Sequence, residues 1–197
     1  MTIKRVSIAA AVAAVLALLV VGLLQLGSSS PPAPAPSKLT LAQMRARLAG
    51  APAPLAALHA QAGELLPGGL RALRSRLAAL RGTPVVINKW SSSCEPCRAE
   101  SGVFQRVSLA RGREVAFIGI DSDEASRGEA LAFLHSFPVS YPSYYDPSGQ
   151  VGTAITDSSF TPVTVFLTRD GGEFIHQGPF PSVAKLEAAV TRYALDA

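Results

Sequence analysis

The chain has 197 residues, of which 48% are hydrophobic, and it carries a formal net charge of +4. This length accommodates one domain of ordinary size with accessory segments. The charge is modest and spread along the chain, which argues against nucleic acid as a partner. We expect the arginine-rich stretches 45–47 and 71–81 to be solvated helix faces, with attraction to anionic lipid headgroups as the alternative.

The N-terminus carries an uncharged apolar run at residues 6–27. As a helix, this run is long enough to span the ~30 Å hydrocarbon core of a bilayer. Lys4 and Arg5 precede it, so the bias of positive charge places the N-terminus in the cytoplasm and the rest of the chain outside. We therefore expect residues 1–27 to be an uncleaved signal anchor in the cell membrane. A cleaved signal peptide is the alternative, but Pro36 follows the nearest cleavage site and disfavours it.

Two segments separate this anchor from the predicted core. Residues 28–37, "SSSPPAPAPS", are rich in proline and serine and predict an extended, semi-rigid linker that holds the domain off the membrane. Residues 38–81 predict a helical N-terminal extension. Its clearest helix ends at Gly82 and has four leucines on one face: Leu70, Leu73, Leu77 and Leu80.

From residue 82 onward, short β-branched runs alternate with amphipathic segments. The predicted strands lie at 84–88, 114–120, 162–167 and 173–178, and the predicted helices at 94–110, 126–137 and 182–195. Ser126 and Glu129 have the capping-box spacing at the start of the second helix, and "RDGG" predicts the hairpin turn between the last two strands. This order indicates an α/β domain with parallel strands, an antiparallel edge and helices on both faces.

The stretch "NKWSSSCEPCRAE", residues 88–100, holds the only two cysteines and the only tryptophan. A disulfide between Cys94 and Cys97 closes almost no loop and contributes little to folding, so the pair indicates chemistry. Cys94 would begin a helix, where free N–H groups and the macrodipole favour a thiolate, and Pro96 suits the first turn. Cys97 lies one turn inside and is more shielded. The spacing predicts a dithiol in which Cys94 attacks and Cys97 resolves.

A metal site is the main alternative for two cysteines at this spacing. It would need two further ligands, and the three histidines show no paired ligand spacing: His59, His135 and His176. We expect no metal and no other cofactor. Export of the segment beyond the anchor also favours disulfide chemistry, because disulfides persist outside the cytoplasm.

"VVINKWSSSCEPCRAE" resembles the thioredoxin fold, and most closely the membrane-anchored ResA/TlpA-like thiol–disulfide oxidoreductases of bacterial envelopes. The resemblance covers residues 82–197, with "VAFIGIDSDE" similar to the second core strand and "YYDPSGQVG" similar to the loop and short helix after the family's insertion. It implies a thioredoxin-like three-layer α/β/α domain with a mixed sheet, preceded by one N-terminal transmembrane helix.

"FTPVTVFL" resembles the strand that begins with a cis-proline facing the cysteines. The resemblance therefore implies that Pro162 is cis and that the backbone of Thr161 pairs with an incoming peptide. A trans proline that simply starts a strand is the alternative. Trp90 is expected to pack beside the disulfide and shield it.

Several acids near the motif are candidates for proton transfer. Thioredoxins carry a buried acid where this chain has Asn88, so Glu95 is the nearest candidate to serve Cys97, unless it is merely an exposed acid on the first helical turn. Asp121 is a weaker candidate base, with a turn or cap residue as the alternative. Arg98 and Glu100 match the family motif, and a surface ion pair is enough to explain them. Ser93, in place of a second tryptophan, makes the rim more polar.

The resemblance implies an extracytoplasmic thiol–disulfide oxidoreductase that reduces disulfides in envelope client proteins, such as apocytochrome c. Its electrons would come from a membrane donor of the thiol-reductase type, and residues 6–27 would contact the lipid bilayer. The "CEPC" form favours reduction. An oxidant that introduces disulfides is one alternative, and a copper-binding or redox-sensing thioredoxin-fold protein is another.

Overall fold

The computed structural model describes residues 33–124 and 126–196. The predicted anchor at 1–27 and the first part of the linker lie outside these residues. Among the described helices, none is both long and apolar enough to cross a membrane.

The core of the molecule is a six-stranded mixed sheet with the strand order β1-β4-β3-β2-β5-β6. Strands β1, β4, β3 and β2 are parallel, whereas β5 is antiparallel to β2 and β6 is antiparallel to β5. The bounds are β1 Leu65–Leu66, β2 Val85–Trp90, β3 Ala116–Ser122, β4 Ser143–Asp146, β5 Val163–Leu167 and β6 Glu173–Gln177. The mixed sheet and its antiparallel edge are as predicted.

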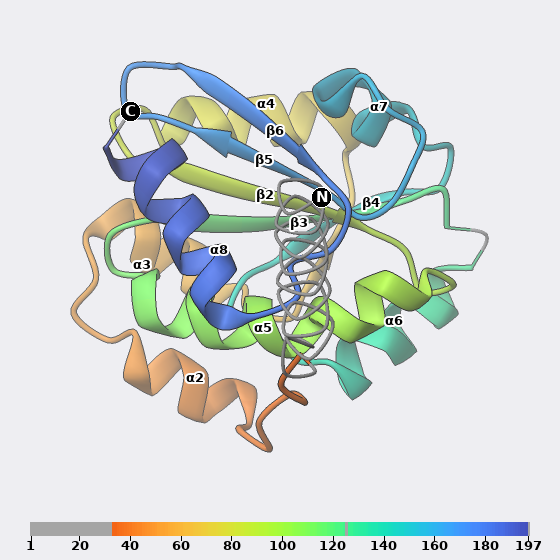
Figure 1. The fold of residues 1–197 in the computed structure, drawn as a ribbon, viewed down its shortest axis with the longest axis horizontal. Helices are drawn as coiled ribbons and strands as arrows, with labels where there is room; N and C mark the ends of the chain where they lie inside the picture. The colour runs from red at the N-terminus through yellow and green to blue at the C-terminus, as the bar shows by residue number, and fades with distance from the viewer. Residues whose placement is uncertain (1–32, 125, 197) are drawn as a thin grey trace, which may run out of the picture. The chain divides into compact units, whose positions relative to one another are not determined.

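Helices cover both faces of this sheet, with α4 and α7 on one side and α5 and α6 on the other (Figure 1). The bounds are α2 Leu41–Arg47, α3 Ala53–Ala60, α4 Gly69–Ala79, α5 Glu95–Arg111, α6 Arg127–Ser136, α7 Gln150–Thr156 and α8 Val183–Val190, followed by the π-helical turn η1 Thr191–Leu195. Two hydrophobic clusters, one on each face, hold the three layers together. The predicted three-layer thioredoxin-like architecture is confirmed.

Two strands were not expected from the sequence. β4 lies in the tyrosine-containing stretch that was expected to be a loop, and β1 lies within the extension that was expected to be helical. β1 pairs with β4 in parallel, so both strands depend on a partner distant in sequence. The two residues of β1 are too few to show the period-2 pattern, and the four residues of β4 are buried or nearly so on both faces and therefore do not alternate.

The extension at 38–81 packs directly on the sheet. Leu55 and Leu58 from α3 and Leu73 from α4 belong to the same buried cluster as Ile87 and Ile118 of the central strands. Residue 82 is therefore not a boundary in the packing, although the character of the sequence changes there.

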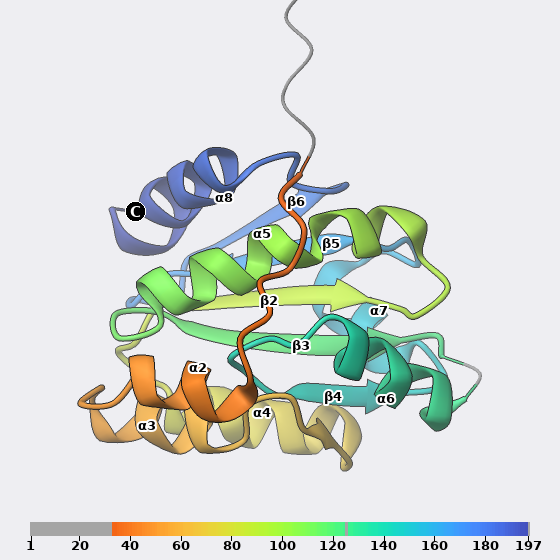
Figure 2. The same ribbon diagram turned by 90° about the horizontal axis from the view of Figure 1, so that it is seen from below.

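The end of the predicted linker does not project away from the domain. Ser37 donates from its N–H and its hydroxyl to Gln105 Oε1 in α5, at 2.5 and 2.7 Å. The carbonyl oxygen of Pro34 lies 1.8 Å from the position that a Cβ of Gly102 would take, so only glycine fits there. Figure 2 shows this segment running across α5. Residues 33–37 of the predicted linker thus contact α5, and its role in holding the domain off the membrane stays a prediction.

Candidate active site

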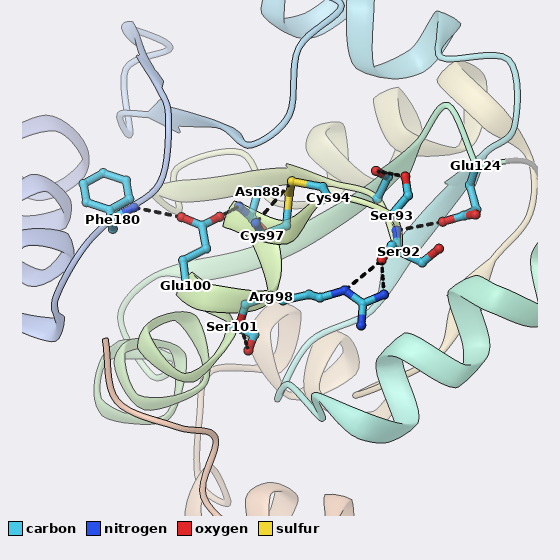
Figure 3. Close-up of a disulfide and its surroundings, with 11 residues drawn as sticks. Asn88, Ser92, Ser93, Cys94, Cys97, Arg98, Glu100, Ser101, Glu124 and Phe180 are labelled. Carbon is cyan, nitrogen blue, oxygen red and sulfur yellow. Dashed lines mark hydrogen bonds between the residues drawn. A yellow bond between two sulfur atoms is a disulfide. The ribbon is translucent and has the colours of Figure 1, made fainter. Parts of the chain in front are cut away.

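The two cysteines lie where α5 begins, just after the carboxyl end of the central strand β2. Cys94 is the N-cap of α5, and its Sγ accepts a hydrogen bond from the N–H of Cys97 at 3.2 Å. Pro96 occupies the first turn, where no N–H donor is needed. The cysteines form a disulfide with their Cα atoms 5.2 Å apart (Figure 3). Cys94 is 9% exposed and Cys97 is 3% exposed, so the first sulfur is the more accessible.

The Thr161–Pro162 peptide bond is cis, as the resemblance implied. It comes directly before β5, whose Val163 pairs with Lys89 of β2. Because the two strands are antiparallel, this register brings the peptide beside the turn that leads from Trp90 to Cys94. Phe160, just before it, is 74% exposed. The roles of Thr161 and Pro162 in holding a client stay predictions.

Trp90 is buried in the same hydrophobic cluster as Cys94 and Cys97. Its ring stacks on Phe133 of α6 with the centroids 4.5 Å apart, and its Nε1 donates to Ser143 Oγ at 3.1 Å. Gly119 of β3 makes room, since a Cβ there would lie 2.9 Å from Nε1. The indole thus joins the cysteine region to α6 and β4.

Glu100 is the functional candidate that the sequence analysis missed. It is 1% exposed and forms no surface ion pair with Arg98, so that interpretation is wrong. Its carboxylate accepts hydrogen bonds from Asn88 Nδ2 and from the N–H of Phe180, each at 2.9 Å (Figure 3). Burial raises its pKa from 4.5 to about 7, against the opposing effect of both bonds. The available signal was its position three residues after Cys97, on the same helix face.

Cys97 and Glu100 both line one small cavity. Its volume is about 20 Å³, enough for a single water molecule. Its lining includes Asn88, Trp90, Cys97 and Glu100. Glu95, in contrast, is exposed, as its alternative interpretation required. Of these two acids, Glu100 is therefore the one that shares a cavity with Cys97.

Asp121 lies within β3 and is fully buried, so its interpretation as a turn or cap residue is wrong. It is the register partner of Trp90. Neither of its carboxylate oxygens has a hydrogen-bond partner among the described residues. Burial, and then the charges of Glu124 and Asp146, raise its pKa from 3.8 to about 8, while Arg127 acts in the opposite direction. At neutral pH this group is protonated and uncharged.

The described residues contain no group of three or more histidine, cysteine, aspartate or glutamate side chains arranged to hold a metal ion. His176, which the copper alternative would need, stacks on the ring of Phe180 with the centroids 4.2 Å apart. Burial lowers its pKa.

Residues 50–171 match the AhpC/TSA family. The thioredoxin-like protein YneN of Bacillus subtilis is 26% identical over 78 residues, which are 39% of this chain and 46% of that protein. The thiol-disulfide oxidoreductase ResA of Oceanobacillus iheyensis is 25% identical over 99 residues, which are 49% of this chain and 50% of that protein. The chain thus matches about half the length of these curated relatives.

Among solved structures, a putative thiol:disulfide interchange protein DsbE from Chlorobium tepidum superposes with a TM-score of 0.52 at 24% identity. The match covers 58% of this chain and 82% of that chain. At this identity the likeness establishes the fold. Together with the family match over residues 50–171 and the likeness to ResA, it confirms the resemblance drawn from the cysteine motif. The chain belongs to the AhpC/TSA family, within the thioredoxin-fold superfamily.

Proposed function

We propose that the protein is a membrane-anchored, extracytoplasmic thiol–disulfide oxidoreductase that reduces disulfides in envelope client proteins, such as apocytochrome c. The observation that carries this proposal is the Cys94–Cys97 disulfide at the start of α5, backed by the buried carboxyl of Glu100. The likeness to ResA supports the same class of reaction. The apolar run at 6–27, with Lys4 and Arg5 before it, supports the anchor and the extracytoplasmic location.

The first step belongs to Cys94 in the reduced protein. The N–H of Cys97 points at its sulfur, and the helix macrodipole favours negative charge there. The pKa of this thiol should therefore fall below the free value of about 8.5. The Cys94 thiolate attacks one sulfur of the client disulfide. A mixed disulfide forms, the client S–S bond breaks, and the second client sulfur leaves as a thiolate and takes a proton.

The second step belongs to Cys97. Its proton passes to the ionised form of Glu100, which has a pKa of about 7 and lines the same small cavity as Cys97. The resulting thiolate attacks Cys94 Sγ, restores the intramolecular disulfide and releases the client with both thiols reduced. Two electrons have then moved from the dithiol to the client. A membrane donor of the thiol-reductase type returns two electrons and two protons.

Trapping of clients tests this order. Cys97→Ser keeps the attacking sulfur and removes the resolving one, so it should accumulate long-lived mixed disulfides on a non-reducing gel. Cys94→Ser should accumulate few, and iodoacetamide should modify Cys94 first in the reduced wild type near neutral pH. If Cys94→Ser traps more client, the order is reversed. If neither variant loses disulfide exchange, the proposed function fails.

The reduction potential decides between reduction and oxidation of clients. A potential near about −270 mV, as in thioredoxin, supports a reductant, whereas one near about −120 mV, as in a strong oxidant, supports introduction of disulfides. Equilibration with glutathione or dithiothreitol buffers, followed through alkylation of the free thiols, measures it. A high-salt wash of membranes tests the anchor. The full chain should stay in the membranes, whereas a chain that starts at residue 38 should be released.

A further inference from the structure

The turn that leads into Cys94 is held from both sides by charged side chains of two different elements. The N–H of Ser92 donates to Glu124 Oε2, from the segment between β3 and α6, at 2.8 Å. The carbonyl oxygen of Ser92 accepts from Arg98 in α5, at 2.6 Å from Nη2 and 3.1 Å from Nε. Figure 3 shows both contacts beside the disulfide.

Burying the Glu124 carboxylate costs free energy, which indicates that its hydrogen bond to the turn is required. Ser92 is 6% exposed and Glu124 is 3% exposed, so a carboxylate has been taken out of water to bind one backbone N–H. Hydrogen bonds to charged groups are shorter and about twice as strong as those between neutral groups. Both backbone polar groups of Ser92 are therefore held firmly, two residues before the attacking sulfur.

We call Glu124 and Arg98, with the Ser92 backbone held between them, the clamp. It connects directly to the N-cap of α5. Cys94 donates its N–H to Ser91 O at 3.3 Å, and its own carbonyl oxygen accepts the N–H of Arg98 at 3.2 Å. Rotation of the Ser92 peptides would thus move Cys94 relative to the free N–H groups of α5. The bond from the Cys97 N–H to Cys94 Sγ depends on that placement.

Asp121 is the buried acid beside the Glu124 side chain. It is buried next to Glu124, and the neighbouring charges that act on it are Glu124, Asp146 and Arg127. Because Asp121 holds its proton at neutral pH, Glu124 does not face a second negative charge from this side chain.

We propose that Glu124 and Arg98 are positioning residues, which hold the Ser92 backbone so that Cys94 Sγ stays at the N-terminus of α5 as a stabilised thiolate. This inference rests on the proposed function, in which Cys94 is the attacking group. Neither side chain takes part in bond making, and both act through the turn.

The test measures the reactivity of Cys94 alone. In the full chain carrying Cys97→Ser, the rate of iodoacetamide alkylation is followed from pH 5 to pH 9. Glu124→Ala should raise the apparent pKa of Cys94 by about one unit, so alkylation should slow about tenfold at pH values well below that pKa, where the rate follows the thiolate fraction. Glu124→Gln should recover most of the rate, because its side-chain carbonyl oxygen still accepts from the N–H of Ser92.

The partner variants act from the exposed side of the clamp. Arg98→Met removes both donors to Ser92 O and should also slow alkylation, whereas Arg98→Lys should fall between Met and wild type. Glu129→Gln is the matched control, since Glu129 lines the same 360 Å³ hollow as Ser92 and Arg98 without bonding to either. It should alkylate at the rate of its parent. Circular dichroism and thermal unfolding show which variants fold.

Two results would overturn the positioning role. One is an equal loss of rate in Glu124→Ala and Glu124→Gln, which would assign the effect to charge alone. The other is an unchanged pH profile in both Glu124→Ala and Arg98→Met. Because alkylation needs no client, these outcomes are independent of the proposed function, which fails instead if a normally alkylated wild type does not reduce client disulfides.

Discussion

The two faces of the sheet bury different kinds of side chain. The face under α5, α6 and α8 holds both cysteines, Trp90 and several phenylalanines, and it also buries Asn88 and Glu100. The opposite face, under α3, α4 and α7, is filled mainly by aliphatic side chains from the same central strands. Its buried charges include Lys89, which donates from Nζ to Ser158 O at 2.5 Å, and Asp146, whose charge acts on Lys89.

The aliphatic face therefore mainly stabilises the fold, whereas the cysteine face holds the groups proposed to take part in the reaction. Close-packed aliphatic side chains stabilise the fold and have no groups that titrate. Buried carboxyls do the reverse, since they cost free energy whenever they ionise and thereby gain pKa values near the working pH. Glu100 and Asp121 both belong to the cysteine face, and both have raised pKa values. Substitutions on the two faces should therefore have different signatures.

The largest effect on stability is expected on the aliphatic face. Leu73 of α4 is fully buried, so Leu73→Ala should lower the free energy of unfolding by about 3 kcal/mol, within a range of about 2–5. The reduction potential of the cysteines should stay unchanged. Urea unfolding and redox equilibration measure the two quantities, and Leu131→Ala, at a side chain 44% exposed, is the surface control. A shift of the reduction potential by more than about 30 mV, equivalent to 1.4 kcal/mol, would show that the two faces are energetically coupled.

Glu100→Gln should have the opposite signature. Resolution of the mixed disulfide should slow about a hundredfold, the lower end of the contribution of a positioned acid or base. The wild-type rate should rise as pH passes about 7, where Glu100 ionises, and the variant should lose that rise. Quenched-flow analysis of the mixed disulfide gives the rate. Glu114→Gln, at an exposed carboxyl after the far end of α5, is the control. A variant that keeps the rise would remove Glu100 from the proton transfer.

Asp121 should make the protein less stable as pH rises. Its pKa is raised from 3.8 to about 8 in the folded chain, so the folded state binds the proton more tightly. Its stabilising effect is full below pH 3.8 and is lost as pH rises through about 8. The slope is about 1.4 kcal/mol per pH unit within that window. Asp121→Asn should flatten this slope, most clearly between pH 7 and 8.

Glu100 also lowers the free energy of unfolding as pH rises, but only up to about pH 7. Between pH 7 and pH 8 the decline is therefore due mainly to Asp121. Over that one unit the wild type should lose about 1 kcal/mol more than Asp121→Asn. Denaturant unfolding at both pH values measures the difference. Parallel losses in the two proteins would show that Asp121 does not hold a proton in the folded state.

The smallest effect is spectroscopic. Trp90 packs in one cluster with both cysteines, so its fluorescence emission should change when dithiothreitol reduces the disulfide. It is the only tryptophan, and no other indole contributes to the signal. The double variant Cys94→Ser with Cys97→Ser should not respond to the reductant. Identical wild-type emission spectra in both redox states would show that the Trp90 indole does not sense the Cys94–Cys97 disulfide.

Local patterns predicted much of the site. The C-x-x-C spacing before a helical stretch predicted that Cys94 would begin the helix and that Cys97 would lie one turn inside, and both are confirmed. The leucine face of α4 is confirmed in the same way. The cis bond before Pro162 came from the family resemblance rather than from the residues.

The failures concern groups whose environment is made by distant parts of the chain. Glu100 was interpreted as a surface acid, and it is buried because Asn88 and Phe180 supply hydrogen bonds from 12 and 80 residues away. β1 was missed because its two residues are too few to show a pattern, and β4 was missed because its four residues do not alternate between buried and exposed; β4 pairs with β3 as well as with β1. The contact of the linker with Gln105 was not predicted, because the composition of residues 28–37 gave no sign of it.

The sequence by itself determined the alternation of strands and helices and the placement of a dithiol at a helix N-terminus. These depend on hydrophobic period, turn residues and spacing, all of which act within a few positions. Only the tertiary structure decided which carboxyl groups are desolvated, as Glu100, Asp121 and Glu124 show. It also decided which backbone N–H groups Glu100 and Glu124 accept from. Desolvation and hydrogen bonding depend on the neighbours in space, and the sheet brings those together from segments far apart in the chain.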